Sequence, residues 1–341
     1  MLRTKDARVR RLHFPTRLKT AYVRRRIITT VIIFLVVYLL NFIIPRLEPG
    51  SILSAIHGAD LLPAQREQLL QMLGVNTPYP QQFENYLKDT FLTFPPNFGI
   101  SFARYPLPVW ALVTQALPWT LLLVGISQAI AWTSGVLLGA WLAWHRGSKA
   151  DSAMFSVSNF MWGVPSYWLA TIFIYVFAIR LKLFPAALSS SGAIGFNLGS
   201  AESILLHSFL PILTLVVLNF PQHALVMRNT MVGVLQEDFI KAAEARGLRT
   251  RTLVLGHAAR NALLPSITNL ALGFGAILSG AYLVEIIFSY PGLGYLIEQS
   301  AIGRDYPVLE AIFFFSAMLV LIANLAADIA YTFLDPRVEN E

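Results

Sequence analysis

The chain has 341 residues, of which 55% are hydrophobic and 13% are charged, and its formal net charge is +7. Soluble domains carry about 25% charged residues, so this composition excludes an ordinary soluble enzyme and a disordered chain. The chain contains no cysteine, which excludes disulfide frameworks, thiolate zinc sites and cysteine nucleophiles.

Six long stretches contain no Asp, Glu, Lys or Arg. They cover residues 27–45, 105–145, 152–179, 203–227, 261–284 and 311–327. A helix needs about 20 apolar residues to cross about 30 Å of hydrocarbon, and it satisfies its own backbone hydrogen bonds in lipid. The pattern therefore predicts an all-α polytopic membrane protein with six transmembrane helices.

The basic residues predict how these helices are oriented. Residues 1–26 contain ten basic residues and one acidic residue, whereas the predicted loop 46–104 contains four basic and five acidic residues. Lys and Arg are enriched in cytoplasmic segments, so we expect both termini and 19 of the 26 basic residues in the cytoplasm. The basic arm is expected to contact anionic lipid headgroups rather than nucleic acid.

The chain divides accordingly into a basic cytoplasmic arm, a first transmembrane helix, an external cap loop, a core of five further transmembrane helices and a cytoplasmic tail. These segments cover residues 1–26, 27–45, 46–105, 106–334 and 335–341. A short helix is expected over 63–74 in the cap loop, because Pro63 suits a first turn and Gly74 suits the position after a helix end. A second external segment, 182–203, is rich in Ser, Gly and Ala and is expected to form a surface loop.

The predicted cytoplasmic loop 228–260 contains six basic and three acidic residues and a short helix within 236–249. Glu237 and Asp238 suit the N-terminus of this helix, and Gly247 suits its end. The alanines between them would let the helix lie closely in a groove of a partner protein. A helix lying on the inner lipid headgroups is the alternative.

This loop resembles the EAA loop of ATP-binding-cassette importer permeases. The matching residues are Glu-Asp-Phe-Ile-Lys-Ala-Ala-Glu-Ala-Arg-Gly at 237–247. Further resemblance, to the dipeptide/oligopeptide/nickel branch of these permeases, lies at 73–78, 146–148, 164–168, 257–265, 284–294, 304–307 and 334–337. Lys241 departs from the general motif, which has Glu at that position.

The resemblance implies the type I importer transmembrane fold, with both termini in the cytoplasm of an inner-membrane protein and a cytoplasmic coupling helix. It also implies a role in ATPase coupling for Glu237, Asp238, Lys241, Ala242, Ala243, Glu244, Ala245, Arg246 and Gly247. The implied partners are a second homologous permease that forms a heterodimer with this chain, two ATP-binding-cassette ATPases and an extracytoplasmic solute-binding protein. Short peptides are the favoured substrate, and oligosaccharides or nickel are the alternatives.

The sequence also bears on chemistry. It contains no Gly-x-x-x-x-Gly-Lys-[Ser/Thr] phosphate loop, so we expect a non-catalytic chain without cofactor or metal, whose partner ATPases bind ATP and Mg²⁺. Glu285 and Asp328 lie in or beside apolar runs, where an ion-coupled secondary carrier would use such acids. Their positions near helix ends favour structural hydrogen bonding instead, and the inverted repeats typical of such carriers are not evident.

Overall fold

The computed structural model describes residues 16–47, 62–72, 77–186, 201–249 and 252–334. Over these ranges the regular structure is helical, apart from one isolated antiparallel bridge between Ile100 and Pro108. The helices are α1 (Thr16–Leu47), α3 (Pro63–Met72), α4 (Tyr79–Phe91), α5 (Val109–Trp144), α6 (Lys149–Trp162), α7 (Ser166–Phe173), α8 (Ala201–Val234), α9 (Asp238–Ala245), α10 (Ala259–Ile287), α11 (Leu293–Ile302) and α12 (Tyr306–Leu334). Two π-helical segments, η1 (Ile174–Arg180) and η3 (Thr252–Ala258), continue α7 and precede α10.

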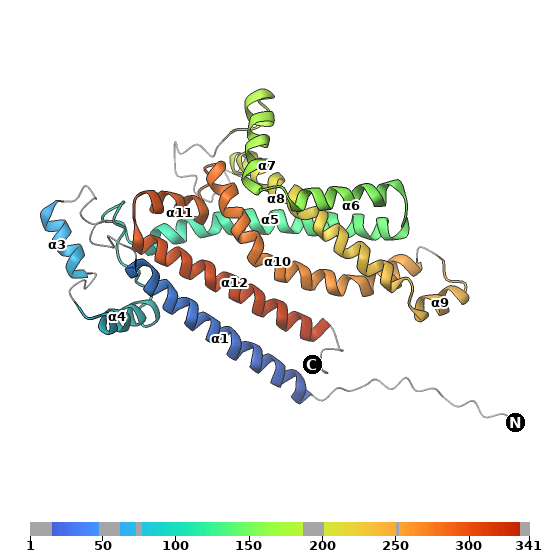
Figure 1. Cartoon of the computed structure of the whole chain (residues 1–341), viewed down its shortest axis with the longest axis horizontal. Coiled ribbons are helices and arrows are strands. Elements are labelled where there is room, and N and C mark those ends of the chain that lie inside the picture. Colours follow the sequence, from blue (N-terminus) through green and yellow to red (C-terminus); the bar gives the residue numbers. More distant parts are fainter. Residues whose placement is uncertain (1–15, 48–61, 73–76, 187–200, 250–251, 335–341) are drawn as a thin grey trace.

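The long helices lie side by side along the longest axis of the molecule (Figure 1). The first turns of α1, the last turns of α12 and the short helix α9 lie toward one end, which we call the α9 end. At the opposite end, the cap end, lie α3, α4 and α11. An ion pair of 3.3 Å between Arg26 Nε and Asp328 Oδ2 joins α1 to α12 near the α9 end.

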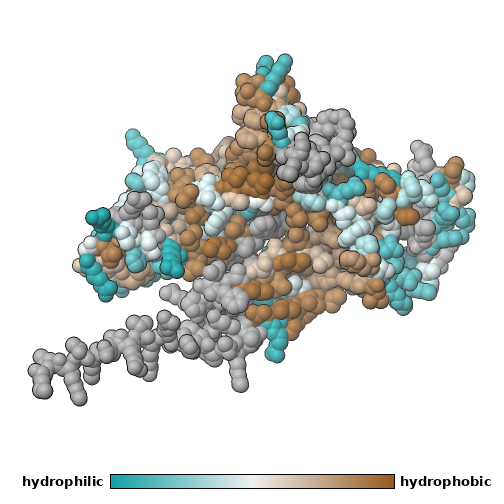
Figure 2. Space-filling view, turned by 180° about the vertical axis from the view of Figure 1, so that it is seen from behind, coloured by the Kyte–Doolittle hydropathy of each residue, from teal (hydrophilic) through white to brown (hydrophobic). Residues whose placement is uncertain are grey.

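Several of these helices are long and apolar enough to cross a membrane. Among the described residues, Val23–Leu47, Val109–Trp144, Glu202–Val234 and Tyr306–Ala326 meet this criterion as single helices. The bent pair of Lys149–Trp162 with Ser166–Arg180 is a fifth candidate if it is counted as one span. Apolar residues form a broad band across the middle of the molecule, and polar residues gather at its two ends (Figure 2).

The structure corrects the expectation of one continuous helix over 152–179. Between α6 and α7 the chain bends by 103°. Pro165 has no N–H to donate, and its ring disfavours the helical conformation at Val164, so α6 ends just before this dipeptide. Pro165 then precedes the first residue of α7 in extended conformation. Hydropathy alone does not detect this break because the residues around it are apolar or uncharged.

The centre of the bundle is the crossing of α5 and α8. A Cβ atom added to Gly139 would lie 2.3 Å from the Ala224 carbonyl oxygen, and one added to Gly135 would lie 2.7 Å from His223 Cβ. Only glycine lets two helix backbones approach so closely, and small residues serve this purpose in membrane helix packing. The Gln128 amide lies 3.1 Å from His223 Nε2 within the same contact.

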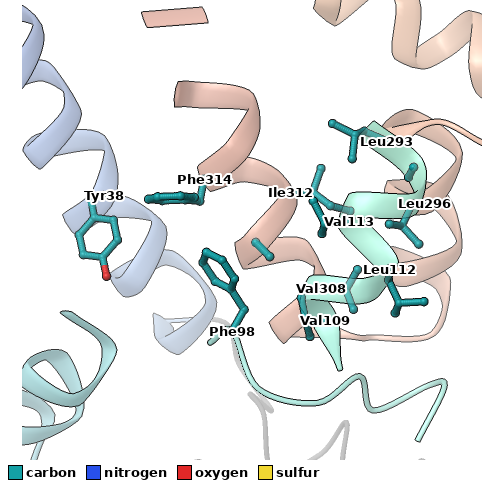
Figure 3. Packing of buried hydrophobic residues seen from close by; sticks show 12 residues of the cluster. Tyr38, Phe98, Val109, Leu112, Val113, Leu293, Leu296, Val308, Ile312 and Phe314 are labelled. Atoms are coloured by element: carbon teal, nitrogen blue, oxygen red, sulfur yellow. The ribbon is translucent and has the colours of Figure 1, made fainter. Parts of the chain in front are cut away.

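At the cap end a second packed layer joins α5, α11 and α12 to α1. Its side chains interlock from all four helices and from the loop that precedes α5 (Figure 3). The labelled members are Tyr38, Phe98, Val109, Leu112, Val113, Leu293, Leu296, Val308, Ile312 and Phe314. The segment predicted to be external is therefore part of the folded bundle where it approaches α5.

The structure describes only part of the segments that were predicted to lie outside the bundle. The short helix expected from Pro63 is confirmed as α3, and the proposed end at Gly74 lies outside the described residues. Helix α4 was not predicted individually. Residues 1–15, most of the expected surface loop (187–200) and the tail 335–341 also lie outside the described ranges.

Candidate functional site

The candidate site is α9 with the residues that cap it. All of the predicted coupling residues lie in α9 or at its two ends, and all are exposed except Ala243, which is half-buried. Glu237 precedes the helix in extended conformation and Asp238 stands in its first turn, where a negative charge opposes the positive end of the helix dipole. The expected start of the helix is thereby confirmed.

The end of α9 is a Schellman motif built on Gly247. The Gly247 N–H donates to the Glu244 carbonyl at 2.8 Å, and the Leu248 N–H donates to the Ala243 carbonyl at 3.4 Å. Gly247 has a φ of +77°, a left-handed conformation that costs other residues about 1–2 kcal/mol. The prediction that the helix ends at this glycine is confirmed. The glycine itself was sufficient to predict the end.

One side of α9 is fixed to the bundle through Ile240. This side chain is 5% exposed and belongs to a cluster drawn from the ends of α5, α8, η3 and α10. The buried members around it are Ala143, Met227, Met231, Ala258 and Ala262. A displacement of α9 therefore acts directly on the ends of three long helices, because close-packed side chains transmit displacement rather than absorb it.

The opposite side of α9 is open. It carries small side chains at Ala242 and Ala245, the exposed ring of Phe239, and an ion pair of 2.9 Å between Lys241 Nζ and Asp238 Oδ1. Lys241 is the residue that departs from the EAA motif. In this chain its charge is turned toward the first turn of its own helix.

A second element at the α9 end was not identified from the sequence. Arg228, near the end of α8, reaches Asp151 on α6 through two bonds: Nη2 to Oδ2 at 2.6 Å and Nε to Oδ1 at 2.9 Å. The same carboxylate accepts the Gly147 N–H at 2.9 Å, and the Ser148 hydroxyl accepts the Asp151 N–H at 3.2 Å. The Ser-x-x-Asp spacing resembles a capping box and marks the start of α6, but nothing local points to Arg228.

Glu285 lies near the cap end of α10, where it contacts the segment that follows this helix. Its carboxylate is fully buried and accepts the N–H of Gly294, in the first turn of α11, at 2.6 Å. A Cβ atom added to Gly292 would lie 2.4 Å from the Glu285 carboxyl carbon. The segment 284–294 thus folds back on its own glutamate, and glycine is required where it does so.

The loop before α5 is held to α12 by Asp305. The Asp305 carboxylate accepts the Phe102 N–H at 3.0 Å and the Ala103 N–H at 3.3 Å, and it also bonds the Ser101 hydroxyl. Arg46 on α1 pairs with Glu310 on α12 at 3.1 Å. The first set of contacts fastens this loop to the start of α12, and the ion pair joins α1 to α12.

The acids and histidines do not assemble into a metal site within the described residues. No group of three or more His, Cys, Asp or Glu side chains there could hold a metal ion. Asp328, like Glu285, has a partner within the protein, since it pairs with Arg26.

Comparison with known proteins identifies the family. The model of the binding-protein-dependent transport system inner membrane component matches residues 135–340, and the model of the N-terminal part of such membrane components matches residues 19–124. The oligopeptide transport system permease protein AppB of Bacillus subtilis (strain 168) is 34% identical over 319 residues, covering 94% of this chain and 99% of that protein. The dipeptide transport system permease protein DppB of the same organism is 33% identical over 305 residues, covering 89% and 93% respectively.

Solved structures provide a comparison of fold. A chain from inward-facing conformations of the MetNI methionine ABC transporter superposes with a TM-score of 0.54 at 17% identity, covering 66% of this chain and 97% of that chain. The overlap shows a shared type I importer-like helical fold. Taken with the family models and the relatives that match almost the whole chain, this protein belongs to the binding-protein-dependent transport system inner membrane components, as a multi-pass permease of the peptide ABC transporter family.

Proposed function

We propose that the chain is one of two homologous membrane subunits of an importer that is driven by ATP and receives its substrate from an extracytoplasmic binding protein. Short peptides are the proposed substrate. Family membership and relatives named for oligopeptide and dipeptide transport support this assignment. The chain forms the pathway with its partner subunit, and separate ATPases bind ATP and Mg²⁺.

The observation that carries this proposal is the two-sided environment of α9. Its open side presents Ala242 and Ala245, which suit close contact with a groove on an ATPase. Its closed side holds Ile240 against α5, α8, η3 and α10. In the proposed mechanism the membrane helices have two alternative arrangements. When the ATPases close, they move α9, and the packed ends of these helices move with it from one arrangement to the other.

The proposed topology has six spans with both termini in the cytoplasm. Four single helices and the bent α6–α7 pair supply five candidate spans, and α10, with 29 residues, supplies the sixth. The beginning of α1 and the end of α12 lie toward the α9 end, which agrees with an even number of crossings. The basic residues at 24–26 and in the α9 loop favour the cytoplasm at this end.

The proposal is tested by purifying the tagged chain from native membranes with mild crosslinking and identifying the proteins that accompany it. We expect an ATPase, a second permease and a solute-binding protein, and peptide added with the binding protein should stimulate ATP hydrolysis. Recovery of a homo-oligomer without an ATPase would refute the importer assignment. Stimulation by oligosaccharides and not by peptides would refute the proposed substrate.

The role of α9 is tested separately with Ala242→Arg, because this exposed alanine can be enlarged without disturbing the bundle. We expect the variant to be produced normally. The amount of ATPase that copurifies with it should fall about tenfold, since an extra charged side chain in a closely fitted contact costs about 1.4 kcal/mol or more of binding free energy. The matched control is Ala301→Arg, an exposed alanine of α11 at the cap end. Equal ATPase recovery from both variants would contradict docking on α9.

A further inference from the structure

The C-terminal end of α4 carries an exposed apolar cluster. Phe91 is 49% exposed, Leu92 is 78% exposed and Phe94, just beyond the helix, is 96% exposed. Large apolar side chains that gather on a surface mark contact with something other than water. We call these three residues the α4 tip.

The contacts of α4 place its tip beside α1 rather than beyond the end of α1. Ring centroids are 5.1 Å apart between Phe83 and Phe42, and 6.1 Å apart between Phe91 and Phe34. Along α4 the contacts therefore run back down α1, away from its cap end. Phe34 precedes Pro45, the last residue of the apolar run, by 11 positions, which corresponds to about 16 Å of helix.

The surface of α1 next to this contact is itself apolar and exposed. Its outward residues include Ile32, Leu35 and Leu39, which are 55%, 53% and 43% exposed. In a transmembrane helix such a surface faces lipid. The α4 tip lies beside this helix, since Phe91 also contacts the buried ring of Tyr38 at 5.3 Å between ring centroids.

The remainder of α4 has one apolar side and one polar side. Its inner side packs Phe83 and Tyr86 against α1. Its outer side exposes Gln81 and an ion pair of 2.6 Å between Lys88 and Glu84.

We propose that the α4 tip inserts into the outer leaflet of the bilayer and anchors the external segment to lipid. The exposure of the tip and its position alongside the apolar span of α1 favour lipid over the binding protein as the occupant. The anchor holds the external segment at a set height above the membrane. This role is independent of the transported substrate and of ATP.

The chain contains no cysteine, so single-cysteine variants can be labelled without background. Leu92→Cys, Phe94→Cys and the control Gln81→Cys each replace an exposed side chain and should preserve the fold. Each full-length variant is labelled with a nitroxide and reconstituted into vesicles of phosphatidylethanolamine and phosphatidylglycerol. Collisions of the nitroxide with oxygen, which enriches in lipid, and with a water-soluble nickel chelate are then compared.

We expect the ratio of oxygen to nickel collisions to be several-fold higher at 92 and 94 than at 81, because oxygen is concentrated in the apolar interior of the bilayer and the polar nickel chelate stays in water. A ratio at 92 or 94 equal to that at 81 would overturn the proposal. Shielding from the nickel chelate that develops only when solute-binding protein is added would also overturn it and would assign the tip to protein docking.

Discussion

The bidentate contact between Asp151 and Arg228 offers a direct test of how the α9 end is held together. The ion pair joins the first turn of α6 to α8 only a few turns before α9, and the two side chains are 10% and 22% exposed. The perturbation is a double-mutant cycle of Asp151→Asn, Arg228→Met and the two combined. Asn keeps an oxygen for the Gly147 N–H, so the first variant removes mainly the charge.

The expected magnitude follows from this partial burial. Two unit charges 4 Å apart attract by about 4 kcal/mol at an effective dielectric constant of 20, and desolvation offsets much of this energy. Exposed pairs contribute about 0.2–1 kcal/mol, whereas breaking a buried pair costs about 3–5 kcal/mol. We therefore expect each single variant to lower the free energy of unfolding by about 2 kcal/mol, with a coupling energy of about 1–2 kcal/mol.

The assay is unfolding of the purified protein by SDS in mixed micelles, followed by circular dichroism. The matched control is the Asp238–Lys241 pair, which has a similar separation but side-chain exposures of 99% and 65%. Asp238→Asn and Lys241→Met should show no measurable coupling, since solvent screens an exposed pair. A coupling at Asp151–Arg228 that is equally undetectable would refute the argument that this contact holds α6 to α8.

Three further predictions concern the cap end. Gly292→Ala should lower the free energy of unfolding by about 1–3 kcal/mol, because its methyl group would overlap the buried Glu285 carboxylate; Gly125→Ala, with open space around it, should not. A similar loss in both variants would contradict this. Glu285→Gln should reduce transport less than about tenfold, since the amide oxygen can still accept the Gly294 N–H; complete loss with an altered pH profile in a transport assay would favour an ion-coupled carrier. Tyr38→Phe should cost about 1 kcal/mol in SDS unfolding through loss of its buried hydrogen bonding to α4, and an unchanged midpoint would show that this bonding contributes nothing.

Much of the helical architecture could be predicted because its signals are local. A long run without charges indicates a spanning helix wherever it packs, and α5, α8 and α12 lie where such runs are found. The boundaries of α9 were predictable for the same reason, since an acidic first turn and a left-handed glycine act within a few residues. The bend between α6 and α7 was harder to predict because Pro165 permits a break but does not set its angle.

The contacts that hold these helices together could not be predicted in the same way. Asp151 and Arg228 are 77 positions apart, and each also reads as an ordinary charge at the edge of an apolar run. Helix α4 has no long apolar run, and its importance comes from rings on α1 that lie about 40–50 positions earlier in the chain. Such pairs depend on the packing of the whole bundle.

The sequence by itself determined that this protein is helical and crosses a membrane, with a short capped helix between two long helices, and the resemblance of its motifs to importer permeases indicated the class of protein. Composition, charge distribution and helix-end residues suffice for the helices, because the bilayer and the backbone act on each segment separately. The tertiary structure alone decided that Glu285 closes a buried turn, that Asp328 pairs with Arg26, and that Ile240 ties α9 to three long helices. Those outcomes depend on which side chains meet, and in a close-packed interior this is settled only when all the helices are in place.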